Sequence, residues 1–237
     1  MLQVCLNGAR SPQEHYQLPV RPEELAKAAA DAVAAGADEI HLHPKSVDGA
    51  DTLDARVVAA VLTSVRAAAP NTPIGITTST WTVPDSAARM AAVRSWTVLP
   101  DYATVHWHEP GAEEVAQALL DRGIGVEAGI LSGTDADQYF LDSPLRSRVH
   151  RVLAKVPDLT TRGAVATARS LLQRLEGVEA PILLHGQSAG AWAVLVLASQ
   201  LGMDARIGLE DTLLLPNSNI ASDNAELVAE AVRQMRR

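Results

Sequence analysis

The chain has 237 residues, of which 47% are hydrophobic and 20% charged, and its formal net charge is −8. This composition can fill a large core, and an acidic chain without a basic block is a poor partner for nucleic acid or an anionic membrane. The single cysteine, Cys5, excludes an internal disulfide. With no signal-peptide pattern and no apolar stretch of membrane-spanning length, we expect a cytoplasmic protein.

Short apolar runs alternate with longer amphipathic segments along the chain. The candidate strands are residues 2–7, 38–43, 73–79, 101–107, 123–129, 149–156, 181–185 and 204–210. The candidate helices are residues 22–35, 52–69, 84–95, 111–121, 161–176, 188–201 and 222–236, and the segment around 134–142 could hold one more short helix. Strict alternation predicts parallel strands with crossover helices, and eight units at this length favour a closed (β/α)₈ TIM barrel over an open sheet. We expect one domain, residues 1–237.

Two histidines, His41 and His43, close the second predicted strand. Residues two apart on a strand point to the same face, so both imidazoles can reach one metal ion. The eighth predicted strand ends in RIGLEDT, residues 206–212, and inward side chains of two even-numbered strands can share a layer of the barrel. Two histidines and one carboxylate, here Glu210, form a common open zinc site. A regular strand would turn only one of Glu210 and Asp211 toward the centre.

A second His-x-His, His106 and His108, ends the fourth predicted strand. It competes with the first pair as a metal site, although no independent carboxylate partner stands out for it. We expect these two histidines to line the substrate pocket. Structural packing and a second metal site remain the alternatives.

The segment Gly186-Gln187-Ser188-Ala189-Gly190 matches the G-x-S-x-G pattern of a nucleophile elbow. In esterases of that fold the catalytic histidine follows the serine, and no histidine follows Ser188 here. Backbone N–H groups at a helix start can instead bind phosphate, as barrels often do after strand seven. Gly186, Ser188 and Gly190 are therefore candidates for binding a coenzyme phosphate, with close packing as the other explanation.

Two further strands carry polar candidates. Thr77 is one of several hydroxyl residues at the end of the third strand, where a hydroxyl could donate to a bound carboxylate. Glu127 lies in the apolar fifth strand, where a carboxylate is costly to bury unless the site needs it.

With these residues in hand, the chain resembles the β-keto acid cleavage enzymes. The resemblance rests on Asn7-Gly8-Ala9, on Ala35-Gly36-Ala37 before His41-Leu42-His43-Pro44, on the glycine-rich turn 186–190, on the RxGLED motif 206–211, and on residues 222–228 (SDNAELV). These motifs run from one end of the chain to the other. At 106–109 the sequence is HWHE, where the family more often has an Asn-containing segment.

The resemblance implies a zinc-binding barrel, usually a homo-oligomer (dimer or tetramer), that condenses a β-keto acid with acetyl-CoA to give acetoacetate and a new acyl-CoA. It implies these roles: His41, His43 and Glu210 as zinc ligands, Asp211 as the base held by Arg206, Thr77 as the strand-three hydroxyl, and Glu127 as the strand-five carboxylate. Two other functions fit the same residues. One is hydrolytic or aldolase-like cleavage without CoA, in which His108 or Glu109 positions water. The other is metal-dependent ligand binding without turnover.

Overall fold

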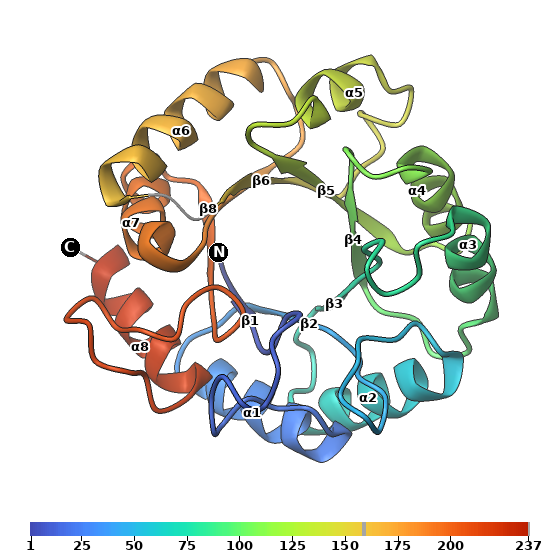
Figure 1. Cartoon of the computed structure of the whole chain (residues 1–237), viewed down its shortest axis with the longest axis horizontal. Coiled ribbons are helices and arrows are strands. Elements are labelled where there is room, and N and C mark those ends of the chain that lie inside the picture. Colours follow the sequence, from blue (N-terminus) through green and yellow to red (C-terminus); the bar gives the residue numbers. More distant parts are fainter. Residues whose placement is uncertain (158–159, 237) are drawn as a thin grey trace.

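A computed structural model describes residues 1–157 and 160–236, and within them eight parallel strands close into a barrel in the order β1 to β8 (Figure 1). The strands are β1 Leu2–Cys5, β2 Glu39–Leu42, β3 Ile74–Thr77, β4 Tyr102–His106, β5 Gly125–Leu131, β6 Arg151–Val156, β7 Ile182–Gly186 and β8 Asp204–Ile207. The helices are α1 Pro22–Ala34, α2 Ala55–Ala68, α3 Ser86–Ser95, α4 Ala112–Leu120, α5 Ala136–Asp142, α6 Thr161–Arg174, α7 Ala191–Gln200 and α8 Asn224–Met235. The predicted (β/α)₈ barrel is confirmed.

Local sequence signals set where the helices begin. Pro22 opens α1, a position where the missing N–H costs nothing. Side-chain oxygens accept from the free N–H groups of four other helices: Asp54 for α2, Asp85 for α3, Thr160 for α6 and Asp223 for α8. Each such cap stabilises its helix by about 1 kcal/mol. None of the helices in the described ranges is long and apolar enough to span a membrane.

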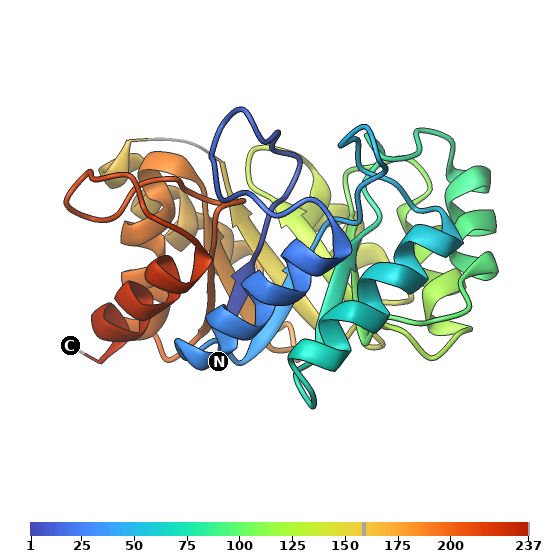
Figure 2. The same ribbon diagram turned by 90° about the horizontal axis from the view of Figure 1, so that it is seen from below.

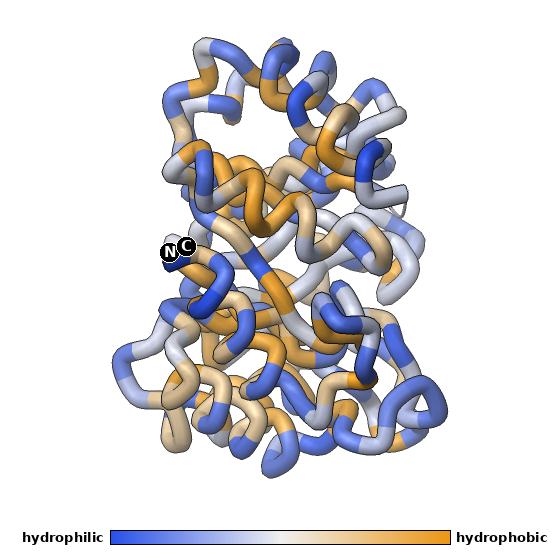
Figure 3. Tube along the Cα trace, turned by 90° about the vertical axis from the view of Figure 1, so that its left-hand side faces the viewer, coloured by the Kyte–Doolittle hydropathy of each residue, from blue (hydrophilic) through white to orange (hydrophobic). Residues whose placement is uncertain are grey.

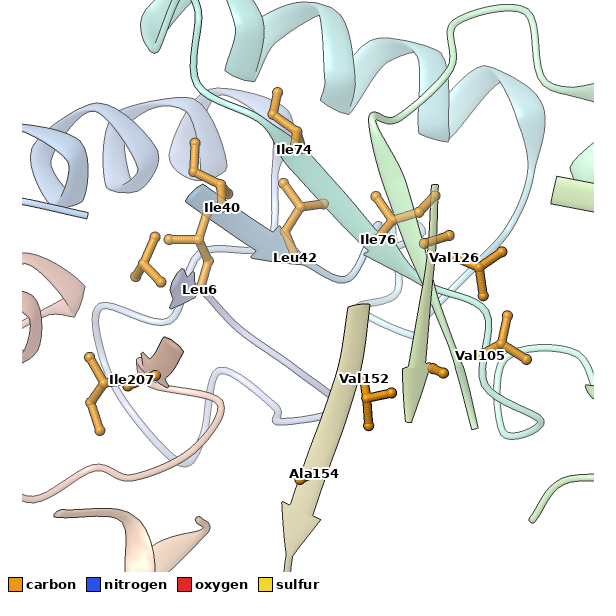
Figure 4. Close-up of a cluster of buried hydrophobic side chains, with 14 of the residues drawn as sticks. Leu6, Ile40, Leu42, Ile74, Ile76, Val105, Val126, Val152, Ala154 and Ile207 are labelled. Atoms are coloured by element: carbon orange, nitrogen blue, oxygen red, sulfur yellow. The ribbon is translucent and has the colours of Figure 1, made fainter. Parts of the chain in front are cut away.

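The main hydrophobic core lies between the strands and the surrounding helices. Apolar residues at alternate strand positions, such as Ile40 and Leu42 on β2 or Ile74 and Ile76 on β3, are fully buried there (Figure 4). Burial of each such side chain contributes about 1.5–3 kcal/mol. Figure 3 shows the resulting division, with hydrophobic segments inside and hydrophilic ones along the outer turns.

The interior of the barrel is polar, because the intervening strand positions carry charged and hydrogen-bonding side chains. Arg151 of β6 donates through Nε to Glu127 at 2.9 Å, pairs with Glu39, and lies over the Tyr102 ring with 4.7 Å between the guanidinium carbon and the ring centroid. Gly75 makes room for that ring, since a Cβ there would lie 2.0 Å from it. These paired charges form a floor beneath the barrel mouth.

The loops that follow the strands gather at one end of the barrel, which faces upward in Figure 2. The sequence predicts that the eighth strand continues to residue 210, and this extension is wrong. β8 ends at Ile207, and the Gly208 carbonyl accepts from the N–H groups of Asp211 and Thr212 at 2.9 and 3.0 Å. A glycine is needed at this turn because Gly208 packs on the backbone of Cys5, where a Cβ would lie 2.0 Å from the carbonyl oxygen.

Candidate metal centre and active site

His41, His43 and Glu210 come together at the barrel mouth. The Nε2 atoms of His41 and His43 lie 3.8 and 3.7 Å from Glu210 Oε2. The two histidines come from the end of β2 and the glutamate from the turn after β8, and both imidazoles are buried. One potential ligand atom from each residue thus points at a common position.

These residues fit a divalent metal ion. Glu210 Oε2 is buried and has no hydrogen-bond partner within the described ranges, while Oε1 lies 2.7 Å from Arg206 Nη2. Burial lowers the pKa of His41 to about 4, which keeps the imidazole in the neutral form that binds metal. One ligand atom from each of the three residues lies within 4.8 Å of the other two, and two imidazole nitrogens with one carboxylate oxygen are a ligand set that zinc takes.

The turn after β8 places two adjacent carboxylates on one guanidinium. Arg206 Nη2 lies 2.7 Å from Glu210 Oε1 and 2.6 Å from Asp211 Oδ1. Asp211 is fully buried, and its Oδ1 also lies 2.8 Å from His185 Nε2. Burial alone would raise the pKa of both carboxyls, but Arg206 holds each below its usual range, with help from His43 and His41 at Glu210 and from His185 at Asp211. Both carboxylates therefore face the centre, which a regular strand would not allow.

The Asn7-Gly8-Ala9 motif supports the triad from β1. Gly8 has φ +57°, and a Cβ there would lie 2.3 Å from Glu210 Cγ. Asn7 accepts from the His43 N–H and donates to its carbonyl, both at 2.9 Å. Asn7 therefore fixes the backbone of His43, and Gly8 leaves space for the Glu210 side chain.

His106 and His108 form a separate pair with ring centroids 5.7 Å apart. Gly129 on β5 makes space for the His106 ring, since a Cβ there would lie 2.4 Å from its Nδ1. Glu109, the nearby carboxylate, instead accepts from Arg89 at 2.9 Å and from the Thr80 N–H at 3.0 Å. Where the chain is described, potential ligand atoms converge in His41–His43–Glu210 and in Cys5–Glu210–Asp211, and the latter is a poor site because burial raises the pKa of the thiol.

The two remaining candidates, Thr77 and Glu127, lie at different depths in the barrel. The Thr77 hydroxyl lies 2.9 Å from Ser79 Oγ at the end of β3. Glu127 lies in the barrel floor, where it accepts from Thr104 at 2.6 Å, Gln3 at 3.1 Å and Arg151. It therefore makes no direct hydrogen bond to the triad, although its charge acts on His41.

The glycine-rich turn after β7 borders a pocket of about 770 Å³ that Ser188, Trp192 and Thr212 help to line. The Ser188 N–H donates to the Asp211 carbonyl at 2.7 Å, so this turn is tied to the active-site turn. Close packing explains the two glycines: a Cβ on Gly190 would lie 2.7 Å from Ala164, and one on Gly186 would lie 2.8 Å from Val194.

The structure adds three residues that had no role assigned from the sequence. Lys155 ends the inward series Arg151, Leu153, Lys155 on β6, and a lysine in an apolar predicted strand is a signal that could have been read. His185 contacts Asp211 from β7. Asp51, which lies 2.7 Å from His43 Nδ1, belongs to a loop with no pattern that would reveal this contact.

Fold and site together define a (β/α)₈-barrel protein with a candidate two-histidine, one-carboxylate metal centre. The family model described as β-keto acid cleavage enzyme matches residues 1–142 and 148–237. The chain belongs to this family, as its motifs predicted.

Three individual proteins are similar to the chain over most of its length. The chain is 24% identical to a 3-keto-5-aminohexanoate cleavage enzyme of Fusobacterium nucleatum subsp. nucleatum, over 98% of this chain and 90% of that protein. ObcA, solved in a ternary complex with a C4-CoA adduct and oxalate, shares the fold with a TM-score of 0.75 at 16% identity, and the match covers 93% of this chain but 64% of ObcA. A 3-dehydroquinate dehydratase from Aquifex aeolicus also shares the fold, with a TM-score of 0.61 at 13% identity, over 99% of this chain and 96% of that one.

Proposed function

We propose that the chain is a zinc-dependent enzyme that condenses a β-keto acid with acetyl-CoA and releases acetoacetate and a new acyl-CoA. His41, His43 and Glu210 would hold the metal. The observation that carries the proposal is the turn after β8. There Arg206 pairs with two adjacent carboxylates, one facing the histidine pair and the other buried beside His185.

The metal, when bound, would supply Lewis acidity toward the keto oxygen of the substrate. Asp211 stays ionised at neutral pH, because Arg206 and His185 keep its pKa below the usual range, so it can accept a proton. Because the same contacts lower its pKa, they also make Asp211 a weaker base. The substrate therefore has to bring its acidic proton within hydrogen-bonding distance of the Asp211 carboxylate.

A β-keto acid is an anion, and the mouth offers a cation and a hydroxyl to receive its carboxylate. Lys155 has no ion-pair partner among residues 1–157 and 160–236; burial lowers its pKa, and the charges of Glu210, Arg206 and Asp211 also act on it. Thr77 contributes its hydroxyl from β3. We assign both to substrate binding. Glu127 acts from the floor by holding Arg151 and Thr104.

His106 and His108 would line the side of the substrate pocket near β4. Burial keeps the pKa of His106 well below its usual range, so its imidazole is neutral and can accept or donate a hydrogen bond. His106 Nδ1 and His108 Nδ1 are buried without a hydrogen-bond partner in the described part of the chain, and His106 Nδ1 packs against Gly129.

The pocket beside the glycine-rich turn is our candidate for the CoA moiety. Its lining reaches the active site through Thr212, which follows Asp211, and through Arg10, whose Nε donates to the Glu210 carbonyl at 3.3 Å. Of the three residues expected to bind the coenzyme, Ser188 lines this pocket. ObcA, which shares the fold, was solved with a CoA adduct, and this supports a CoA-linked reaction.

The test is turnover of a β-keto acid panel by zinc-loaded protein with ¹³C-labelled acetyl-CoA. We expect the label in acetoacetate and an unlabelled new acyl-CoA, and product from Asp211→Asn at a rate about 10²–10⁴-fold lower. Cleavage without any acyl-CoA would replace acetyl transfer by a hydrolytic or aldolase-like reaction. If the protein retains its metal but forms no product from any β-keto acid of the panel, the result would favour a metal-dependent binding protein without turnover. The dimer or tetramer that the family implies stays a prediction, and sedimentation of the purified protein measures it.

A further inference from the structure

Asp51, in the loop between β2 and α2, connects a candidate metal ligand to two other side chains. Its Oδ2 lies 2.7 Å from His43 Nδ1 and accepts from Trp81 Nε1 at 3.0 Å. Its Oδ1 accepts from the Lys45 ammonium at 2.6 Å, and an antiparallel bridge joins the backbones of Lys45 and Asp51. The Asp51 side chain is only 6% exposed, although it belongs to a surface loop. Both of its oxygens are therefore engaged, and its position is fixed from three sides.

The contact with His43 decides which ring nitrogen carries the proton. An ionised carboxylate can only accept hydrogen bonds, so His43 Nδ1 must donate. The lone pair of His43 then lies on Nε2, the atom that faces Glu210 Oε2 at 3.7 Å. His41 differs, because its Nδ1 is buried without a hydrogen-bond partner in the described part of the chain. Of the two imidazoles, His43 is thus the one whose tautomer the protein sets through a carboxylate.

Trp81 strengthens this arrangement from the loop after β3. Its indole stacks on the His43 ring, with centroids 6.1 Å apart and an interplanar angle of 21°. Its other neighbour is the His106 ring, with centroids 5.9 Å apart. The same indole donates to Asp51. Trp81 therefore constrains the plane of the His43 ring directly and its Nδ1 through Asp51.

We propose that Asp51 is a positioning residue of the metal centre, which holds His43 in the Nδ1–H tautomer with Nε2 free to bind the metal. The inference rests on the proposed role of His41, His43 and Glu210 as ligands. Lys45 and Trp81 keep the Asp51 carboxylate in place. Partners of this kind orient a ligand imidazole and raise its basicity, and their loss typically lowers metal affinity 10–100-fold.

The experiment measures Zn²⁺ affinity of the full chain, after removal of metal, by competition with a chromophoric chelator. We expect Asp51→Asn to bind Zn²⁺ about 10–100-fold more weakly than wild type. The matched control is Asp48→Asn in the same loop, which removes an equal charge from an exposed residue that contacts Ser46 and Ala50. We expect this control to stay close to wild type. Equal affinity of the two variants would overturn the inference.

A second measurement needs no variant. ¹⁵N NMR of the metal-free wild-type protein reports which imidazole nitrogens are protonated. We expect His43 to show a protonated Nδ1 and an unprotonated Nε2, and the reverse would overturn the inference even if Asp51→Asn does not fold. Wild-type protein that binds no Zn²⁺ would overturn the metal centre itself. Normal wild-type affinity with an unaffected Asp51→Asn would overturn only the role of Asp51.

Discussion

At the scale of single residues, Arg206 organises the site. It is buried, and its guanidinium contacts Glu210 and Asp211, which keeps two neighbouring carboxylates ionised where one alone would be costly. The different roles of the Glu210 and Asp211 carboxylates follow from their other contacts. Glu210 faces two imidazoles, which suits a metal ligand, whereas Asp211 faces one imidazole and suits a proton acceptor.

Replacing Asp211 with Asn should therefore separate catalysis from metal binding. The amide cannot accept the proton, so we expect kcat to fall about 10²–10⁴-fold, as for loss of a general base. Zinc content should remain that of wild type, because Glu210 and both histidines are intact. Steady-state kinetics beside elemental analysis measure both quantities. A kcat within tenfold of wild type would remove Asp211 from the role of base.

The sequence was informative about residues on strands and poor on residues in loops. His41 and His43 could be paired from strand periodicity alone, and the barrel topology linked them to Glu210. Asp51 and Trp81 could not be found this way, because their contact joins the loops after the neighbouring strands β2 and β3 and follows no regular spacing in the sequence. Lys155 was detectable as a charge in an apolar strand.

At the scale of elements, the turn after β8 creates the site. Gly208 approaches the backbone of Cys5 too closely for a side chain, and its carbonyl accepts from the N–H groups of Asp211 and Thr212. The sequence contained the glycine, but periodicity treated it as one more strand position. A regular strand would turn only one of Glu210 and Asp211 toward the centre, whereas the family resemblance gives both a role in the site.

Gly208→Ala tests this turn. The new Cβ would lie 2.0 Å from the Cys5 carbonyl oxygen, and backbone on both sides would have to move. Overpacking of this kind lowers the free energy of unfolding by about 1–3 kcal/mol. We expect a loss of at least about 2 kcal/mol in urea unfolding, together with reduced zinc content. Gly125→Ala, whose Cβ would lie 3.2 Å from the Asp101 carbonyl, is the milder comparison. Equal stability of the two variants would contradict the importance of the turn.

At the scale of the whole molecule, the barrel keeps two kinds of interior apart. The outer layer between strands and helices is apolar and supplies stability, while the inside of the barrel is polar and carries the floor and the active site. The alternation of strands and helices predicted this architecture well, because it depends on periodicity. The strand ends were less accurate, since hydrogen bonding around the mouth decides them.

Buried neutral histidine makes stability depend on pH. Burial and Arg206 lower the pKa of His185 to about 4, against 6.5 for the free side chain. The unfolded chain therefore takes up a proton between pH 6.5 and 4 that the folded protein does not. The free energy of unfolding should therefore decrease as the pH is lowered from 6.5 to 4. This group contributes up to about 1.4 kcal/mol per pH unit to that decrease. Below about pH 4 the contribution should level off.

His185→Gln provides the comparison. The variant lacks the titrating imidazole, so its unfolding free energy, measured with metal chelated, should depend less steeply on pH between 6.5 and 4 than that of wild type. Groups remote from His185 titrate equally in both proteins and cancel, and the Gln amide can still donate to Asp211, whose pKa His185 lowers. Parallel curves for the two proteins would show that His185 is not held neutral.

The most direct test of the central claim is the metal content of the purified protein by elemental mass spectrometry. We predict about one zinc per chain in wild type, loss of zinc in His41→Ala and Glu210→Ala with the fold retained by circular dichroism, and full zinc in His108→Ala. Metal retained by both of the first two variants, or lost in His108→Ala instead, would contradict a metal centre at the ends of β2 and β8.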